Sequence, residues 1–150
     1  MRFTEGEIRE IVRLARQKGE TPDLRGYDLS GLGLYKADLS GADLSEADLT
    51  EVNLSQSNLR QVQLHKATMS QAHLSMANLQ GANLREANLF SADLVSADLR
   101  GADLRAAHLE GANLHGADLR GADLRGTQYD SYTRWPVGFD LEETRGPYSV

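Results

Sequence analysis

Carboxylate, imidazole and guanidinium side chains are spread along most of this 150-residue chain. Aspartates recur through residues 23–123, and paired carboxylates held in a cleft could carry out general acid–base chemistry. Arginines follow many of them two positions later, as Arg100 follows Asp98, and a row of guanidinium groups could bind an anion. Ring nitrogens that could coordinate a metal ion belong to His65, His73, His108 and His115. Which chemistry is possible depends on the elements that position these side chains.

A five-residue repeat positions nearly all of them. From Leu24 to Leu124 every fifth residue is leucine except Met69, which gives twenty-one central positions at one spacing. Alanine stands two places before most central residues and Asp or Asn one place before, as in Ala42-Asp43-Leu44. An α-helix would displace successive leucines by about 140°, and a continuous strand would alternate them between two faces. A helix and a long strand are both excluded for residues 22–126.

A chain that bends after each short extended piece keeps every central residue inside, and such a chain is a β-solenoid. The central residue and the residue two before it share parity and point inward, while the residues between and after them point outward. Glycine often stands two after the central residue, where a type II turn needs a positive φ. Where Glu46, Lys66, Glu86 or Ser91 stands there, we expect a turn of a different shape.

The tandem Ala-Asp/Asn-Leu-X-X run resembles the pentapeptide repeat proteins. The resemblance implies a right-handed, quadrilateral, parallel β-helix with four pentapeptides per coil. On that basis we expect an all-β solenoid of about five coils in residues 22–126. We treat 1–150 as a single domain, with an N-terminal capping helix in 4–19 and an irregular aromatic C-terminal cap and tail in 127–150.

Both ends of such a solenoid need covering, because they expose apolar core and unpaired backbone groups. Thr4 and Glu7 have the spacing of a helix capping box, and Phe3 and Ile8 that of a hydrophobic staple. The apolar face of this helix would comprise Ile8, Ile11, Val12 and Ala15. We favour a lid over the first coil to a partner-binding or membrane-surface helix. The C-terminal cluster, favoured as a second cap over a ligand site, comprises Tyr129, Tyr132, Trp135, Pro136, Phe139 and Leu141.

Four repeats per coil would stack residues twenty apart into outward columns. Two columns are rich in arginine, namely Arg25, Ser45, His65, Arg85, Arg105 and Arg125, and Ser40, Arg60, Gln80, Arg100 and Arg120. Each is flanked by a column of Asp, Asn or Gln, so we interpret them as charge ladders rather than as an anion-binding stripe. His108 and His115 fall on different faces, and His73 lies two coils, about 10 Å, from His115. We therefore expect no metal site.

Catalysis is not expected, because the outward aspartates recur as part of the repeat and no phosphate loop or triad-like grouping interrupts it. We expect no cofactor either. The candidate protein-contact patch is apolar: Phe90 and Val95 occupy outward positions on adjacent sides of one coil, and Met76 should lie near Val95. The consensus weakens around Met69, where we favour a repacked layer over a binding hinge.

The favoured function is a rigid, non-enzymatic protein-interaction module with an unknown protein partner. The resemblance supplies an alternative, a modulator of DNA gyrase or topoisomerase that imitates duplex DNA with an acidic rod, although arginines interrupt the acidic columns here. The net charge of -6 disfavours direct binding to nucleic acid or anionic lipid. No apolar run has the length of a membrane span or of a signal peptide core, so we expect a cytoplasmic protein and favour a monomer.

Overall fold

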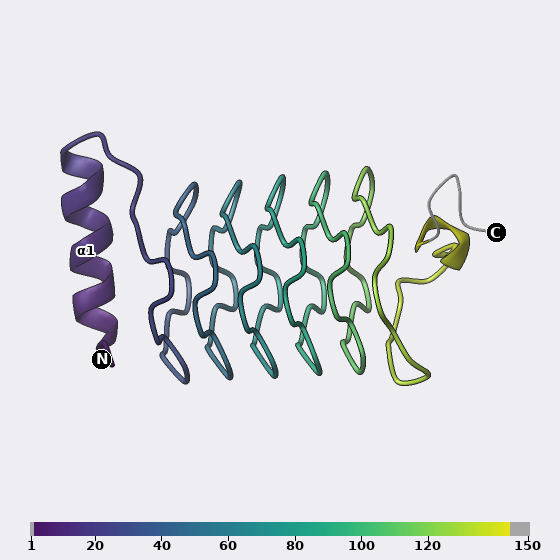
Figure 1. The fold of residues 1–150 in the computed structure, drawn as a ribbon. Helices are drawn as coiled ribbons and strands as arrows, with labels where there is room; N and C mark the ends of the chain where they lie inside the picture. The colour runs from purple at the N-terminus through teal and green to yellow at the C-terminus, as the bar shows by residue number, and fades with distance from the viewer. Residues whose placement is uncertain (1, 145–150) are drawn as a thin grey trace.

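The computed structural model describes residues 2–144, and its fold is a stack of coils with one helix at the N-terminal end (Figure 1). The helix α1 covers Glu5–Gln17, and a 3-10 helix, η1, covers Leu141–Thr144. Between them, parallel bridges join residues twenty apart, such as Asp43 and Gln63. These bridges involve one residue each, and the described part of the chain contains no longer strand. The repeat therefore folds as a parallel solenoid of very short extended pieces joined by turns.

Every backbone N–H group of a typical repeat has a partner, as the repeat around Leu44 illustrates. The N–H groups of Asp43, Leu44 and Glu46 donate to carbonyls of the neighbouring coils at 2.8–2.9 Å. That of Ala42 donates across the preceding turn at 3.0 Å. The fifth, from Ser45, donates to the Asp43 side chain, whose Oδ1 lies 3.0 Å away. The Asp or Asn before each leucine thus accepts the one N–H that the coil leaves unpaired.

Three consecutive repeats lack this side-chain acceptor. Gln63, Thr68 and His73 stand where Asp or Asn is usual, and in this stretch of the described chain none of them accepts the N–H two residues later. Their bridges still join residues twenty apart, and Met69 is as fully buried as the leucines around it. The weak consensus around Met69 therefore changes the turn chemistry and leaves the path of the chain regular.

The inward side chains form one continuous core. All central residues from Leu24 to Leu124 are buried, and the most exposed of them, Leu119, is 7% exposed. Alanines fill most of the inward positions between them. A polar residue, Ser57, occupies one such position and is satisfied because its Oγ donates to Leu54 O at 2.5 Å. The small alanine side chains let neighbouring sides of a coil approach while the leucines fill the centre.

The corners share one backbone conformation, which contradicts the expectation of a different turn at residues other than glycine. Glu46, Lys66, Glu86 and Ser91 have φ values of 61°, 56°, 59° and 54°, beside 64–74° for the glycines at the same position. The expectation was wrong because inter-coil hydrogen bonds impose this geometry, as when Lys66 N–H donates to Arg85 O at 3.0 Å. Each such residue accepts a left-handed conformation that costs about 1 kcal/mol.

The helix α1 begins and ends with local capping. Thr4 Oγ1 accepts the Glu7 N–H at 3.2 Å, and Glu7 Oε2 accepts the Thr4 N–H at 2.8 Å, so the predicted capping box is present. Gly19 follows the C-cap with φ 69°, which reverses the chain toward the first coil. Ile8 and Val12 are buried against the core, as the apolar face of the helix predicted.

The bridges continue beyond residue 126, to Gln128 and to Arg134, the second with one additional residue in the coil. Tyr129 and Trp135 follow these two residues and take the place that leucine has elsewhere. Their rings meet edge to face at 5.5 Å, and Trp135 stacks on Phe139 at 4.6 Å. The aromatic segment therefore extends the solenoid by two sides before the chain leaves it.

Candidate functional site

Four columns of bridged residues run along the four sides of the solenoid, and each is named here after one member. The Asp103 face comprises Asp23, Asp43, Gln63, Asn83, Asp103 and Asp123. The Asp48 face comprises Asp28, Asp48, Thr68, Asn88, His108 and Gln128. The Asp93 face comprises Gly33, Asn53, His73, Asp93, Asn113 and Arg134. The Asp98 face comprises Asp38, Asn58, Asn78, Asp98 and Asp118. The Asp93 and Asp103 faces lie on opposite sides, because they are two sides apart along each coil.

Arginine–aspartate pairs dominate the Asp103 and Asp98 faces. Arg105 Nη2 lies 2.7 Å from Asp103 Oδ2 in its own repeat, whereas its Nε is 3.8 Å from Asp123 Oδ2 in the next coil. Similar pairs within a repeat are formed by Arg25, Arg100, Arg120 and Arg125. The guanidinium groups are therefore already engaged by carboxylates, as the charge-ladder interpretation predicted.

The aspartates act as ionised acceptors. Hydrogen bonds from the Arg25 guanidinium lower the pKa of Asp23 to about 2. The guanidinium of Arg100 likewise lowers the pKa of Asp98, and hydrogen bonds from Ser30 lower that of Asp28. A general acid at neutral pH needs a raised pKa. Among residues 2–144, every aspartate whose pKa is shifted has a lowered pKa. These carboxylates serve the turns and the ion pairs.

The histidines are separated from one another. A ring nitrogen of His65 lies 3.1 Å from Arg85 O, and Nδ1 of His108 lies 3.5 Å from Glu110 Oε1. Within residues 2–144, no group of three or more His, Cys, Asp or Glu side chains could hold a metal ion.

Over the same range, each helix is too short or too polar to cross a membrane.

Exposed apolar side chains gather along the Asp93 face. Within residues 22–126, the large apolar side chains that are exposed are Tyr35, Met76 and Phe90, at 44%, 60% and 48%. All three stand at turns that border this face. Met76 N–H donates to Val95 O at 2.9 Å, so these two residues meet on neighbouring coils, although Val95 itself is half-buried. Phe90 lies at the other edge of the face, one turn before Asp93.

The two edges of this face also lack the arginines of the opposite side. The residues that follow the central positions at these edges are Ser30, Thr50, Ser70, Phe90 and Glu110, and Tyr35, Ser55, Ser75, Val95 and His115. Near the C-terminal end, Tyr132 is 77% exposed and lines a pocket of about 510 Å³ with Phe90, Asn113 and Arg134. Sequence reasoning missed Tyr35 and assigned Tyr132 to the C-terminal cap, where the structure leaves it exposed. Tyr35 could have been found from the sequence, because steps of twenty residues from Val95 lead to it. Tyr132 could not be placed in this way, because the additional residue before Arg134 breaks the period.

A family model described as pentapeptide repeats matches residues 37–75, 69–105 and 87–126. The solved pentapeptide repeat protein Rfr23 from the cyanobacterium Cyanothece 51142 is 29% identical, covers 87% of this chain and 98% of its own, and superposes with a TM-score of 0.78. A pentapeptide repeat protein from Nostoc PCC 7120 is 30% identical over 91% of each chain, with a TM-score of 0.33. QnrB1, a plasmid-mediated fluoroquinolone resistance protein, is 19% identical over 73% of this chain and 80% of its own, with a TM-score of 0.27. No curated protein sequence matches the chain.

Proposed function

Because this chain belongs to the pentapeptide repeat family, we propose that it is a rigid, non-enzymatic protein-interaction module. Its contact surface is the apolar border of the Asp93 face, with Met76, Phe90 and Val95 at its centre. We propose further that the solenoid is right-handed with about five coils and that α1 and residues 127–144 close its two ends; the parallel bridges between residues twenty apart support the coil count. The partner is a protein that presents an apolar surface of its own.

The one-sided distribution of exposed apolar side chains supports this surface. Met76 and Phe90 border the Asp93 face, whereas the opposite face and the Asp98 face carry arginine–aspartate pairs. Binding energy at protein interfaces is concentrated in a few large side chains that are shielded from water, and charged groups are depleted there. The backbone of each of these residues is hydrogen-bonded to one neighbouring coil, as when the Gln71 N–H donates to Phe90 O at 2.8 Å, so little backbone conformational entropy is lost on binding.

Mimicry of DNA receives less support from the charges. An acidic rod needs unpaired carboxylates in rows, but on the Asp103 and Asp98 faces an arginine lies 2.6–2.8 Å from most of them. These pairs leave little net negative charge on either face. A supercoiling assay with purified DNA gyrase separates the two functions: the interaction module predicts no effect, and inhibition would favour the mimic.

The test is recovery of partners from the native host with variants that keep the fold. Phe90→Glu and Val95→Lys place a charge in the proposed contact, and each should lower partner recovery at least roughly tenfold. Arg85→Glu is the matched control, because Arg85 occupies the equivalent turn position in the same coil, on an edge of the opposite face. Circular dichroism verifies that all three variants stay folded. Equal recovery with Phe90→Glu and Arg85→Glu would contradict the proposed surface.

A further inference from the structure

The last coil leaves backbone groups without partners on one side, residues 117–121, which is called the open side here. One coil earlier, the N–H groups of Leu99 and Gly101 donate to carbonyls of the open side at 2.8 and 3.0 Å. The corresponding N–H groups of Leu119 and Gly121 have no acceptor within the described residues 2–144. An unpaired edge of this kind is a template for another strand.

The inner coils show what pairs with such an edge. The Asp118 N–H donates to Ala97 O at 2.9 Å, so each inner side forms three hydrogen bonds with the side that is stacked on it. Ala117 O is the corresponding acceptor on the open side, and no N–H of residues 2–144 donates to it. An extended segment that continued the stack in parallel would therefore satisfy two donors and one acceptor at once.

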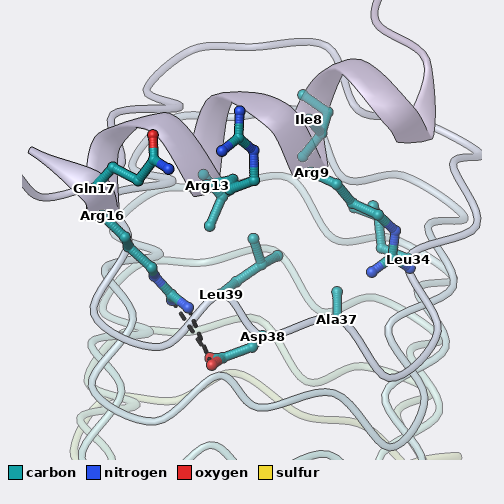
Figure 2. Close-up of a pocket in the computed structure, with 10 residues that line it drawn as sticks. Ile8, Arg9, Arg13, Arg16, Gln17, Leu34, Ala37, Asp38 and Leu39 are labelled. Carbon is teal, nitrogen blue, oxygen red and sulfur yellow. Dashed lines mark hydrogen bonds and ion pairs between the residues drawn. The ribbon is translucent and has the colours of Figure 1, made fainter.

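The N-terminal edge of the stack, in contrast, is covered by arginine side chains. Arg9 and Arg16 reach from α1 toward the first coil (Figure 2). Arg9 Nη2 donates to Tyr35 O at 3.3 Å. Arg16 Nη2 donates to Ser40 O at 3.0 Å, and its Nη1 lies 3.0 Å from Asp38 Oδ2. In the inner coils, carbonyls at the positions of Tyr35 and Ser40 accept a backbone N–H of the preceding coil, so the arginines replace a coil that is missing at this end.

The C-terminal segment covers only part of the last coil. The Leu114 N–H donates to Arg134 O at 2.7 Å, and the Gly126 N–H donates to Thr144 O at 3.2 Å. Between these two points the edge is unpaired, and a pocket of about 600 Å³ lies between the open side and residues 136–139. Val137 lines this pocket and is 94% exposed, so the pocket has an accessible apolar wall. A volume of this order holds a ligand of a few residues.

The arginine ladder indicates which side chain an added strand carries. Arg100 Nε lies 3.9 Å from Asp118 Oδ2 of the following coil, and Arg105 Nε lies 3.8 Å from Asp123 Oδ2. Arg120 pairs with Asp118 of its own repeat at 2.6 Å, and its side chain is 78% exposed. Within residues 2–144, no following coil offers Arg120 a second carboxylate. An acidic residue on the added strand would stand where the next aspartate stands in the inner coils.

We propose that the open side binds an extended segment of a partner protein as one more parallel strand, and that this segment carries an Asp followed by an aliphatic residue. The N–H of that Asp donates to Ala117 O, and two carbonyls of the segment accept the unpaired N–H groups of the open side. The carboxylate lies beside Arg120. The next residue points inward by parity and is apolar, because Leu119 and Val137 line the pocket there.

Amide hydrogen exchange, followed by nuclear magnetic resonance, tests whether this side is open. In the free chain, the amides of Leu119 and Gly121 should exchange at least roughly tenfold faster than those of Leu99 and Gly101. The second pair is a matched control, because it holds the same positions one coil earlier and is hydrogen-bonded. Equal protection of all four amides would overturn the proposal, because the edge would then already be paired.

The probe for strand addition is the peptide acetyl-Ser-Ala-Asp-Leu-Thr-Val-amide, added to the full chain. At ten times the Kd measured from amide shifts, it should slow exchange at Leu119 and Gly121 roughly tenfold. The same peptide with N-methyl-aspartate keeps every side chain but lacks the N–H for Ala117 O, and it should bind about fivefold more weakly. No protection by the first peptide, or equal binding of both peptides, would overturn the proposal.

Two variants test the acidic residue of the segment. Arg120→Gln should weaken binding of the peptide about threefold, since the pair is exposed. Arg60→Gln is the matched control, because Arg60 belongs to the same column far from the open side, and it should leave binding unchanged. Equal weakening by both variants would contradict the pairing with Arg120. Protection that rises with protein concentration in the absence of peptide, together with dimers in analytical ultracentrifugation, would identify a second copy as the occupant and overturn the assignment to a partner segment.

Discussion

Replacement of Asp93 separates the structural role of the outward carboxylates from a chemical one. Asp93 Oδ1 accepts the Val95 N–H at 3.0 Å, and no arginine forms an ion pair with this side chain in the described residues. Asp93→Ala removes the acceptor from a half-buried N–H, which should lower the free energy of unfolding by about 1 kcal/mol. Asp93→Asn keeps an oxygen at the same place, so its cost should stay below about 0.5 kcal/mol.

Urea denaturation followed by circular dichroism measures both variants. The comparison uses the midpoint at an unchanged slope, because a change of slope in a repeat protein would indicate lost cooperativity between coils. The expected order of stability is wild type and Asp93→Asn together, then Asp93→Ala. If Asp93→Asn destabilises as much as Asp93→Ala, the negative charge matters and the hydrogen-bond explanation is refuted.

Three further predictions concern the turns and the ion pairs. Thr68→Asn should supply the side-chain acceptor that this repeat lacks and so stabilise the protein by about 0.5–1 kcal/mol, seen as a higher midpoint of urea denaturation. An unchanged or lower midpoint would count against this role. Gly101→Ala should lower the free energy of unfolding by about 1 kcal/mol because of its φ of 67°. Gly111→Ala should lower it further, because the added Cβ would lie 3.0 Å from a serine hydroxyl. Equal thermal midpoints for the two variants would contradict this contact. The pKa of Asp23 is lowered, so the stability that its ionised form contributes is complete above about pH 4 and is lost as the pH falls toward 2. Arg25→Gln should make the stability measured by urea denaturation less dependent on pH across that window. An unaltered acid profile would refute the pairing.

The core and the N-terminal helix could be predicted from the sequence because their signals are local. A five-residue period places Leu44 and all the remaining central residues inside, and the structure buries all of them. Thr4 and Glu7 have the Thr-x-x-Glu spacing of a capping box, and the structure forms that box. The family membership that the repeat indicated is confirmed by the match to the family model.

The turns and the C-terminal segment depend on contacts between coils, and sequence reasoning was weaker there. Lys66 adopts the same left-handed conformation as the glycines because its N–H must reach the next coil, a constraint that local turn preferences do not contain. Tyr129 and Trp135 follow bridged residues at the position that leucine has elsewhere, but Tyr129 is exposed, Trp135 is only partly buried, and an additional residue interrupts the period. Predicting which residues border the Asp93 face required the number of repeats per coil, and that number, four, came only from the family resemblance.

Photocrosslinking in the native host tests most directly the claim that one side of the solenoid carries the contact. The photoreactive residue p-benzoylphenylalanine would replace Phe90, Met76 or Arg85 in separate variants, each verified to fold. Our account predicts that the first two capture the same protein, because both border the Asp93 face, and that the third captures none. Capture of that protein from the position of Arg85 with equal yield, or no capture from Phe90 and Met76, would contradict the account.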